Sequence, residues 1–149
     1  ENTPVVSTGG SMGGQSALVY TYYAKRTPVA CVANCPVCDM VFHFTERPDL
    51  PRTIYSAYFN EASTMNEALE KHSPLHLAPR MPKVKYLIFH CDDDKAVNID
   101  SHSRKFVDAM KSLNHNISFT VVEGKGHCDI GDDNYKKFIA YCSAAIENA

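Results

Sequence analysis

The chain has 149 residues, of which 44% are hydrophobic and 21% are charged, and its formal net charge at pH 7 is −2. This length and composition predict one ordinary globular domain, and the near-neutral charge excludes the broad basic surface that holds nucleic acid or an anionic membrane. No run of about 18 apolar residues occurs that could cross a bilayer, so we expect neither nucleic acid nor a membrane as a partner.

The first residues of the given sequence do not show the pattern of a targeting segment. Glu1 to Pro4 lack the basic and apolar regions of a signal peptide, and the chain does not begin with Met. We therefore expect the sequence to be a piece of a longer protein, which leaves its localisation open. The cysteines lie mostly in apolar or strand-like runs, which predicts reduced thiols and favours a cytoplasmic setting. They are Cys31, Cys35, Cys38, Cys91, Cys128 and Cys142.

The first third of the chain is typical of a buried parallel sheet. A β-branched run over residues 3–8 predicts a strand, the glycine-rich residues 9–14 predict a tight turn, and residues 15–25 carry a helical stripe of apolar side chains. Residues 28–33 form a near-continuous apolar run, which indicates a second strand buried on both faces.

Regular periodicity then stops between about residues 35 and 82, a proline-rich stretch in which we expect short helices, one of them near 61–71. We interpret this stretch as a lid-like insertion that covers the pocket and selects the substrate. Its aromatic residues would form an apolar wall; they are Phe42, Phe44, Tyr55, Tyr58 and Phe59.

Regular patterns return in the last part of the chain. Residues 84–89 and 117–122 predict strands and residues 100–113 predict a helix. A last helix, capped by Asp132 or Asp133, is expected to run through Ile146. Strands that alternate with helices imply βαβ units, so the predicted fold class is α/β, with a mostly parallel sheet flanked by helices.

The clearest chemical motif is G-x-S-x-G at residues 9–13, placed between a predicted strand and a predicted helix. A serine at such a turn has strained backbone geometry, so we expect Gly9 and Gly13 to be needed because side chains there would clash. Ser11 is then the candidate nucleophile, and the Met12 N–H is its first oxyanion donor. The alternative, a phosphate-binding loop, would show G-x-G-x-x-G or Gly-Lys-Ser/Thr, which are absent here.

A serine nucleophile needs a histidine base and a carboxylate that orients it. Asp92, Asp93 and Asp94 follow the predicted strand at 84–89, and His127 follows the strand at 117–122. Both loops lie at the carboxyl ends of parallel strands, where such sheets bear their sites. The chain order Ser, Asp, His is also that of the strand-turn-helix hydrolases.

Taken in order, these motifs resemble the α/β-hydrolase superfamily and, within it, the prolyl oligopeptidase-like peptidases and related esterases. The resemblance rests on Gly-Gly-Ser-Met-Gly-Gly at 9–14, Ile-Phe-His-x-x-x-Asp-x-x-Val at 88–97 and Gly-x-Gly-His at 124–127. It implies that Asp94 is the acid of the triad. It also implies that residues 1–149 are a partial domain, the second half of the catalytic domain, without the loop that supplies the second oxyanion N–H. Cys91 stands where this family usually has glycine.

The predicted function is therefore a serine hydrolase that cleaves a small ester or a peptide through an acyl-enzyme, without a metal or organic cofactor. One alternative is a non-catalytic hydrolase half that forms a homo-oligomer, or complements a missing N-terminal part, through its open sheet edge. Another is a metal site on Cys31, Cys35 and Cys38, whose spacing can hold an iron–sulfur cluster.

Other residues of this region are interpreted as structural. Cys128 is a weak candidate nucleophile because it has no glycine elbow, and His90 is expected to pack beside the acid loop. The remaining histidines are expected at the surface or in the insertion; they are His43, His72, His76, His102 and His115.

Overall fold

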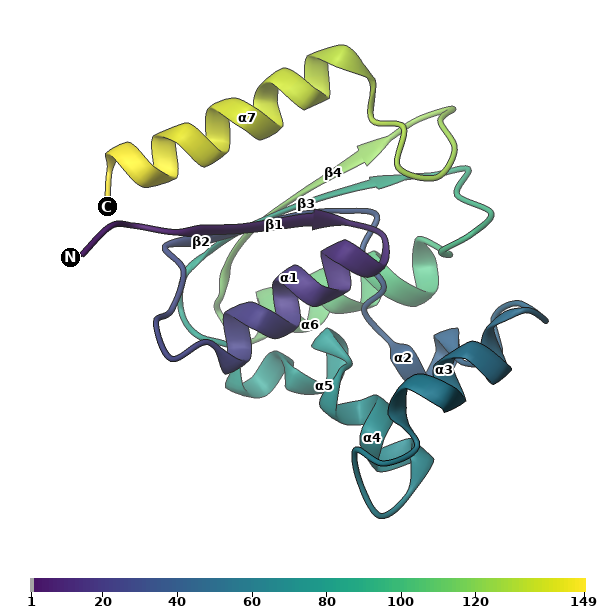
Figure 1. Cartoon of the computed structure of the whole chain (residues 1–149). Helices are drawn as coiled ribbons and strands as arrows, with labels where there is room; N and C mark the ends of the chain where they lie inside the picture. The colour runs from purple at the N-terminus through teal and green to yellow at the C-terminus, as the bar shows by residue number, and fades with distance from the viewer. Residues whose placement is uncertain (1) are drawn as a thin grey trace.

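A parallel β-sheet forms the centre of the chain in a computed structural model, which describes residues 2–149 and leaves Glu1 outside the described residues (Figure 1). Within those residues the sheet has four strands in the order β1-β2-β3-β4, each parallel to its neighbour. The strands are β1 (Val6–Gly10), β2 (Ala30–Asn34), β3 (Lys85–Cys91) and β4 (Asn116–Val122). The predicted α/β fold class is thereby confirmed.

The register brings the carboxyl ends of the strands to one edge of the sheet. Gly10 is level with Asn34, Asn34 is level with Phe89, and Cys91 is level with Val122. The loops that follow the strands therefore start side by side. This edge is where the sequence predicts the site.

Helices cover both faces of the sheet. The helix α7 (Gly131–Glu147) lies across one face, whereas α1 (Met12–Tyr23) and α6 (Lys105–Ser112) lie on the other (Figure 1). A π-helical turn at Asp100–Arg104 leads into α6, in the segment predicted as one continuous helix. Among the described residues, no helix combines the length and the apolar character needed to span a bilayer.

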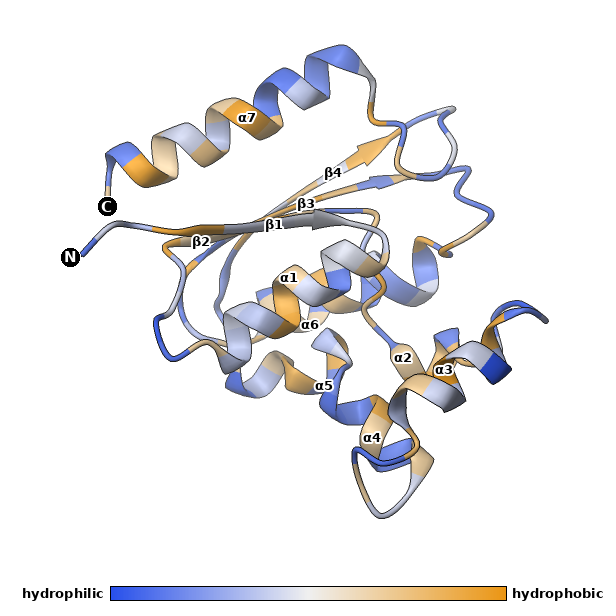
Figure 2. Ribbon diagram, in the orientation of Figure 1, coloured by the Kyte–Doolittle hydropathy of each residue, from blue (hydrophilic) through white to orange (hydrophobic). Residues whose placement is uncertain are grey.

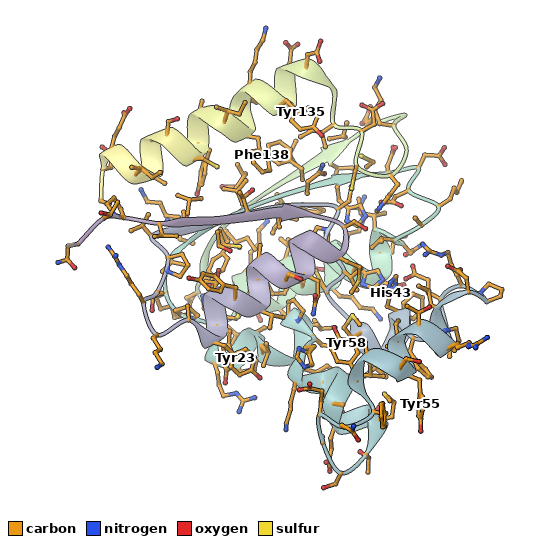
Figure 3. The ribbon with its side chains drawn as sticks, in the orientation of Figure 1. Tyr23, His43, Tyr55, Tyr58, Tyr135 and Phe138 are labelled. Atoms are coloured by element: carbon orange, nitrogen blue, oxygen red, sulfur yellow. The ribbon has the colours of Figure 1, made fainter. Side chains whose placement is uncertain are left out.

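The core follows the two-residue period of the strands. In β2, Cys31 and Ala33 pack on the side of α1 and α6, while Val32 between them packs on the side of α7. On that second side, the rings of Phe89 and Phe138 stack with their centroids 6.0 Å apart. Figure 3 shows Phe138 pointing from α7 toward the sheet, and Figure 2 shows hydrophobic residues alternating with hydrophilic ones along this helix.

The stretch from residue 35 to 82 folds into short helices below the sheet (Figure 1). They are α2 (Met40–His43), α3 (Leu50–Tyr58), α4 (Met65–Lys71), α5 (Pro74–Leu77) and a 3₁₀ turn at Ala78–Arg80. These helices build a small core of their own around Met40, Ile54 and Leu69, and Val97 from the loop after β3 joins it. The insertion is thus packed against the loop that bears the predicted acid.

The predicted apolar wall of the insertion is divided. Phe44 and Tyr58 pack against the small core, but Phe42, Tyr55 and Phe59 are exposed. Tyr55 and Phe59 stack on each other with ring centroids 5.8 Å apart, and Figure 3 shows Tyr55 on the outer side of α3. Residues one helical turn apart share a face, so these two rings form an outward stripe.

The start of the last helix also differs from the prediction. The cap position is Ile130, whose side chain makes no capping hydrogen bond, and the helix begins at Gly131. Gly131 has φ of 72°, a left-handed conformation that glycine adopts without penalty. Asp132 and Asp133 lie inside the first turn, where their charge favours the helix dipole.

Candidate active site

Ser11 occupies a strained turn between β1 and α1. Its backbone has φ of 58° and ψ of −122°, a region that non-glycine residues rarely adopt. Its N–H donates to the Asn34 carbonyl oxygen at 2.9 Å, and its own carbonyl oxygen accepts from the Gln15 N–H at 3.1 Å. These bonds tie the turn to β2 on one side and to α1 on the other. Met12 is the first residue of α1, so its amide is among the N-terminal donors that have no partner within the helix.

The glycines around Ser11 have unequal roles. A Cβ on Gly9 would lie 2.2 Å from the Gly13 carbonyl oxygen, so glycine is required there, as predicted. Apart from its chain neighbours and the backbone of its own helix, a Cβ on Gly13 would meet no heavy atom within 4 Å, and the prediction of a clash at Gly13 is therefore wrong. The second crowded position is Gly14, whose Cβ would lie 3.0 Å from two atoms of Pro36.

The structure brings Ser11, His127 and Asp94 together. His127 Nε2 lies 2.8 Å from Ser11 Oγ, and His127 Nδ1 lies 2.7 Å from Asp94 Oδ2. The three side chains come from the loops after β1, β4 and β3 respectively. The His127 side chain is 30% exposed whereas that of Asp94 is completely buried. The imidazole can thus meet a molecule from solvent, while the carboxylate is shielded behind it.

Asp94 is held as a carboxylate by its surroundings. Its Oδ1 accepts hydrogen bonds from the amides of Ala96 at 2.9 Å and Val97 at 2.8 Å. Its Oδ2 faces His90 Nε2 at 3.2 Å as well as His127. Burial raises the pKa of Asp94, but the hydrogen bonds from the two histidines and the two amides outweigh burial and hold the pKa well below its ordinary value.

The neighbouring aspartates lie outside this arrangement. Asp92 and Asp93 are exposed. Asp92 accepts a hydrogen bond from the Gly124 amide at 2.8 Å, and Asp93 pairs with Lys95 at 2.6 Å. Of the three candidate acids, only Asp94 contacts His127 within the part of the chain that the structure describes.

His90 is completely buried beside the acid loop, as predicted. Its Nε2 lies 2.9 Å from the Val97 carbonyl oxygen, which can only accept, so this nitrogen carries the proton. Its Nδ1 then accepts from the Ser103 hydroxyl at 2.6 Å. His90 therefore braces both Asp94 and the backbone that follows it.

A second polar cluster, which the sequence does not predict, joins the insertion to the acid loop. Glu46 Oε2 lies 2.7 Å from His43 Nδ1 and 2.8 Å from His102 Nε2, and Glu46 Oε1 accepts from the Asn98 amide at 2.7 Å. Burial raises the pKa of Glu46, but these hydrogen bonds hold it well below its ordinary value. Arg47 adds a hydrogen bond to the Ala96 carbonyl oxygen at 3.0 Å.

His43 lies in the insertion, as expected, whereas His102 and His115 lie outside it and are buried, so the expectation of a surface or insertion position is wrong for these two. His43 and His102 are 2% and 0% exposed, and His115 is buried as well. His102 Nδ1 accepts from the amides of Cys38 at 3.1 Å and Asp39 at 3.2 Å. Its Nε2 must therefore carry the proton that is donated to Glu46.

The cysteines are free thiols in the described residues, and they are divided between the two faces of the sheet. Cys31 and Cys38 lie in the core under α1, while Cys35 lies in the core under α7. The alternative of one metal site on these three residues is therefore wrong. Cys35 instead lies beside Cys91, with 3.6 Å between the two sulfurs.

Thiols also reach the edge of the candidate site. Cys128 Sγ lies 3.6 Å from His127 Nε2. The Cys91 thiol donates to the Asp129 carbonyl oxygen at 3.2 Å. Cys91, which stands where the family usually has glycine, is therefore accommodated in the core. A hydrogen bond from Cys128 lowers the pKa of Cys35 to about 6, whereas burial raises the pKa of Cys91 to about 12.

The chain is similar to known hydrolases in sequence and in fold. The model of the prolyl oligopeptidase family matches residues 1–145. No curated protein matches the chain in sequence.

Solved structures match almost the whole chain. The acylaminoacyl peptidase of Pyrococcus horikoshii has a TM-score of 0.75 at 17% identity, with 98% of this chain and 25% of that chain covered. Dipeptidyl peptidase 4 of Porphyromonas gingivalis has a TM-score of 0.69 at 21% identity, with 95% and 19% covered. A thermophilic esterase of Thermogutta terrifontis has a TM-score of 0.66 at 22% identity, with 93% and 53% covered. The chain thus spans about a quarter of the first of these structures.

Proposed function

Because the chain belongs to the prolyl oligopeptidase family, we propose that it carries the catalytic residues of a serine hydrolase, with Ser11 as nucleophile, His127 as general base and Asp94 as the orienting acid. The observation that carries this proposal is the continuous line of hydrogen bonds from Ser11 Oγ through His127 to Asp94, at 2.8 and 2.7 Å. The strained conformation of Ser11 adds support, because backbone strain of this kind gathers at functional sites.

The proposed reaction is acyl transfer in two steps. Ser11 Oγ attacks the carbonyl carbon of the substrate while its proton passes to His127 Nε2, and the buried Asp94 carboxylate stabilises the imidazolium. The tetrahedral intermediate collapses to an acyl-enzyme as His127 gives that proton to the leaving alcohol or amine. Water then attacks the acyl group, again with His127 as base, which releases the acid and restores Ser11.

The negative charge that develops on the substrate oxygen needs hydrogen-bond donors. The Met12 amide at the start of α1 is the first donor in this proposal, since it follows the nucleophile directly. Hydrolases of this fold take a second donor from a loop that precedes the nucleophile strand. We assign that donor to sequence outside the 149 residues.

The substrate is proposed to be a small ester or a peptide, and the stretch from 35 to 82 is proposed to act as its lid. The hydrogen bonds of Glu46 and Arg47 to Asn98 and Ala96 support this assignment. They link the stretch directly to the loop that bears Asp94. A substrate that contacts the insertion would thereby affect the position of the loop that bears Asp94.

A second candidate function is supported by the position of β1 at the edge of the sheet. An open parallel edge is a surface on which another chain can add a strand. In this alternative the chain is a non-catalytic half that dimerises, or complements a separate N-terminal part, through β1. The oligomeric state and the reactivity of Ser11 distinguish the two candidates.

The test is the reaction of the purified chain with a fluorophosphonate, with the adduct mapped by mass spectrometry. Ser11→Ala is the control for the site, and Ser16→Ala, one turn along α1, is the matched control for a hydroxyl without a base. A serine hydrolase gives an adduct on Ser11 that is lost in Ser11→Ala and retained in Ser16→Ala. A folded chain that stays unlabelled, alone and with the upstream sequence added, contradicts the proposal.

A further inference from the structure

We propose that Cys35, Cys128 and His127 form a binding site for a thiophilic divalent cation, Zn²⁺, immediately beside Ser11. The two sulfurs and one imidazole nitrogen all lie within 4.8 Å of one another. Cysteine and histidine are common zinc ligands in proteins, and three protein ligands leave a fourth position for water.

The spacing of the Cys128 and His127 donor atoms fits one tetrahedral ion. Zinc bonds of about 2.3 Å to sulfur and about 2.0 Å to nitrogen separate two tetrahedral ligands by about 3.5 Å. Cys128 Sγ and His127 Nε2 are 3.6 Å apart. The pair therefore already has the separation that a shared ion requires, and the remaining donor, Cys35 Sγ, lies within 4.8 Å of both.

The backbone holds the two cysteines at this place. Both have left-handed conformations, with φ of 46° at Cys35 and 61° at Cys128, which non-glycine residues adopt only when their surroundings impose it. The Cys35 amide donates to the Phe89 carbonyl oxygen at 2.7 Å. The Asn34 side-chain amide donates to the Cys128 carbonyl oxygen at 3.1 Å. Adjacent strands thus fix the two thiols relative to each other.

Other groups of metal-binding residues are less suited to an ion. Cys35, His90 and Asp94 also lie close together, but all three are buried, and His90 and Asp94 are saturated by the hydrogen bonds described above. In the group of His43, Glu46 and His102, the carboxylate already accepts a hydrogen bond from each histidine. At the proposed site, by contrast, Cys128 and His127 are partly exposed, so an ion can enter from solvent.

Metal binding would inhibit the proposed chemistry. Zinc takes the lone pair of His127 Nε2, the atom that lies 2.8 Å from Ser11 Oγ, and the two thiols release their protons to the solvent as they bind. This consequence rests on the proposed hydrolase function, whereas the binding itself does not. Zinc should slow fluorophosphonate labelling of Ser11 by about 10²–10⁴, the usual contribution of a general base.

The experiment titrates the chain, kept reduced with a phosphine, with Co²⁺ and Zn²⁺ and follows the cobalt–thiolate absorption. We expect one ion per chain, with the absorption lost in Cys35→Ser and in Cys128→Ser. It should be retained in Cys142→Ser, a partly exposed thiol on α7. Ser11→Ala should bind the metal with the same affinity as the unaltered chain. The metal-binding result can therefore be interpreted even if the hydrolase proposal fails.

A second measurement needs no variant and therefore does not depend on the folding of one. Zinc should protect Cys128 of the unaltered chain from iodoacetamide, as mapped by mass spectrometry, and a chelator should restore both alkylation of Cys128 and labelling of Ser11. Absence of cobalt–thiolate absorption in the folded chain overturns the proposal. Stoichiometric binding that survives in folded Cys35→Ser and Cys128→Ser, with no protection of Cys128, also overturns it.

Discussion

Replacing Gly9 with alanine would place a methyl group inside the backbone of α1. The added carbon would lie 2.2 Å from the Gly13 carbonyl oxygen and 2.4 Å from the carbonyl carbon. Neither atom can move aside without shifting the first turn of the helix, so we expect the upper end of the cost of overpacking, about 3 kcal/mol. For a domain of this size, that cost lowers Tm by roughly 6–12 °C.

Gly13→Ala is the matched control, because its added carbon has no heavy atom within 4 Å apart from its chain neighbours and the backbone of its own helix. Alanine is also favoured over glycine inside a helix by about 0.5–1 kcal/mol, so Tm should stay the same or rise slightly. Both variants are compared with the parent by thermal unfolding followed by circular dichroism, and Ser11 labelling is measured below Tm. Equal losses of stability in the two variants, or a Gly9→Ala variant as stable as the parent, would refute this reasoning.

Three further predictions concern the carboxylates of Asp94 and Glu46. Asp94→Asn should slow ester hydrolysis by about 10⁴, because the amide no longer selects the His127 tautomer that accepts from serine; unchanged turnover would assign the acid elsewhere. Because the pKa of Asp94 is lowered on folding, the unfolded chain takes up the proton first as pH falls. Tm should therefore decrease as the pH is lowered below about 4, and it should decrease less in Asp94→Asn. Glu46→Gln would direct an amide N–H at the protons of His43 and His102, and urea unfolding should show a loss of about 1–3 kcal/mol; no loss would contradict the assigned tautomers.

Local patterns were sufficient to predict the sheet and the motif residues. The run at 28–33 is apolar at nearly every position because β2 is buried on both faces. The G-x-S-x-G motif and the loop positions of Asp94 and His127 follow from the same strand and turn signals. The roles of Gly13 and Gly14 could not be predicted from the sequence, because they depend on which atoms of a distant segment, such as Pro36, lie against the turn.

The insertion was predicted less well, because its contacts join residues far apart in the chain. Glu46 and His102 are 56 residues apart and neither stands in a recognisable motif. The spacing of Cys31, Cys35 and Cys38 was misleading for a related reason. The alternation of β2 determines the face of the sheet on which Cys31 lies. Cys35 itself has a left-handed backbone conformation and lies in the core on the opposite face, where it packs with Cys91 and Cys128. Only the register of the strands brings these thiols together.

The hydrogen bond between Ser11 and His127 closes a loop of 116 residues. Contacts between residues so far apart require the intervening chain to be ordered, and they are slow to form because the entropy of closing the loop precedes the gain. A partly folded chain that has its helices but has not yet added β4 to the sheet would leave Ser11 without its imidazole. The rate at which Ser11 becomes reactive during refolding would therefore report when the four-stranded sheet is complete. It would not report when the turn that contains the serine forms.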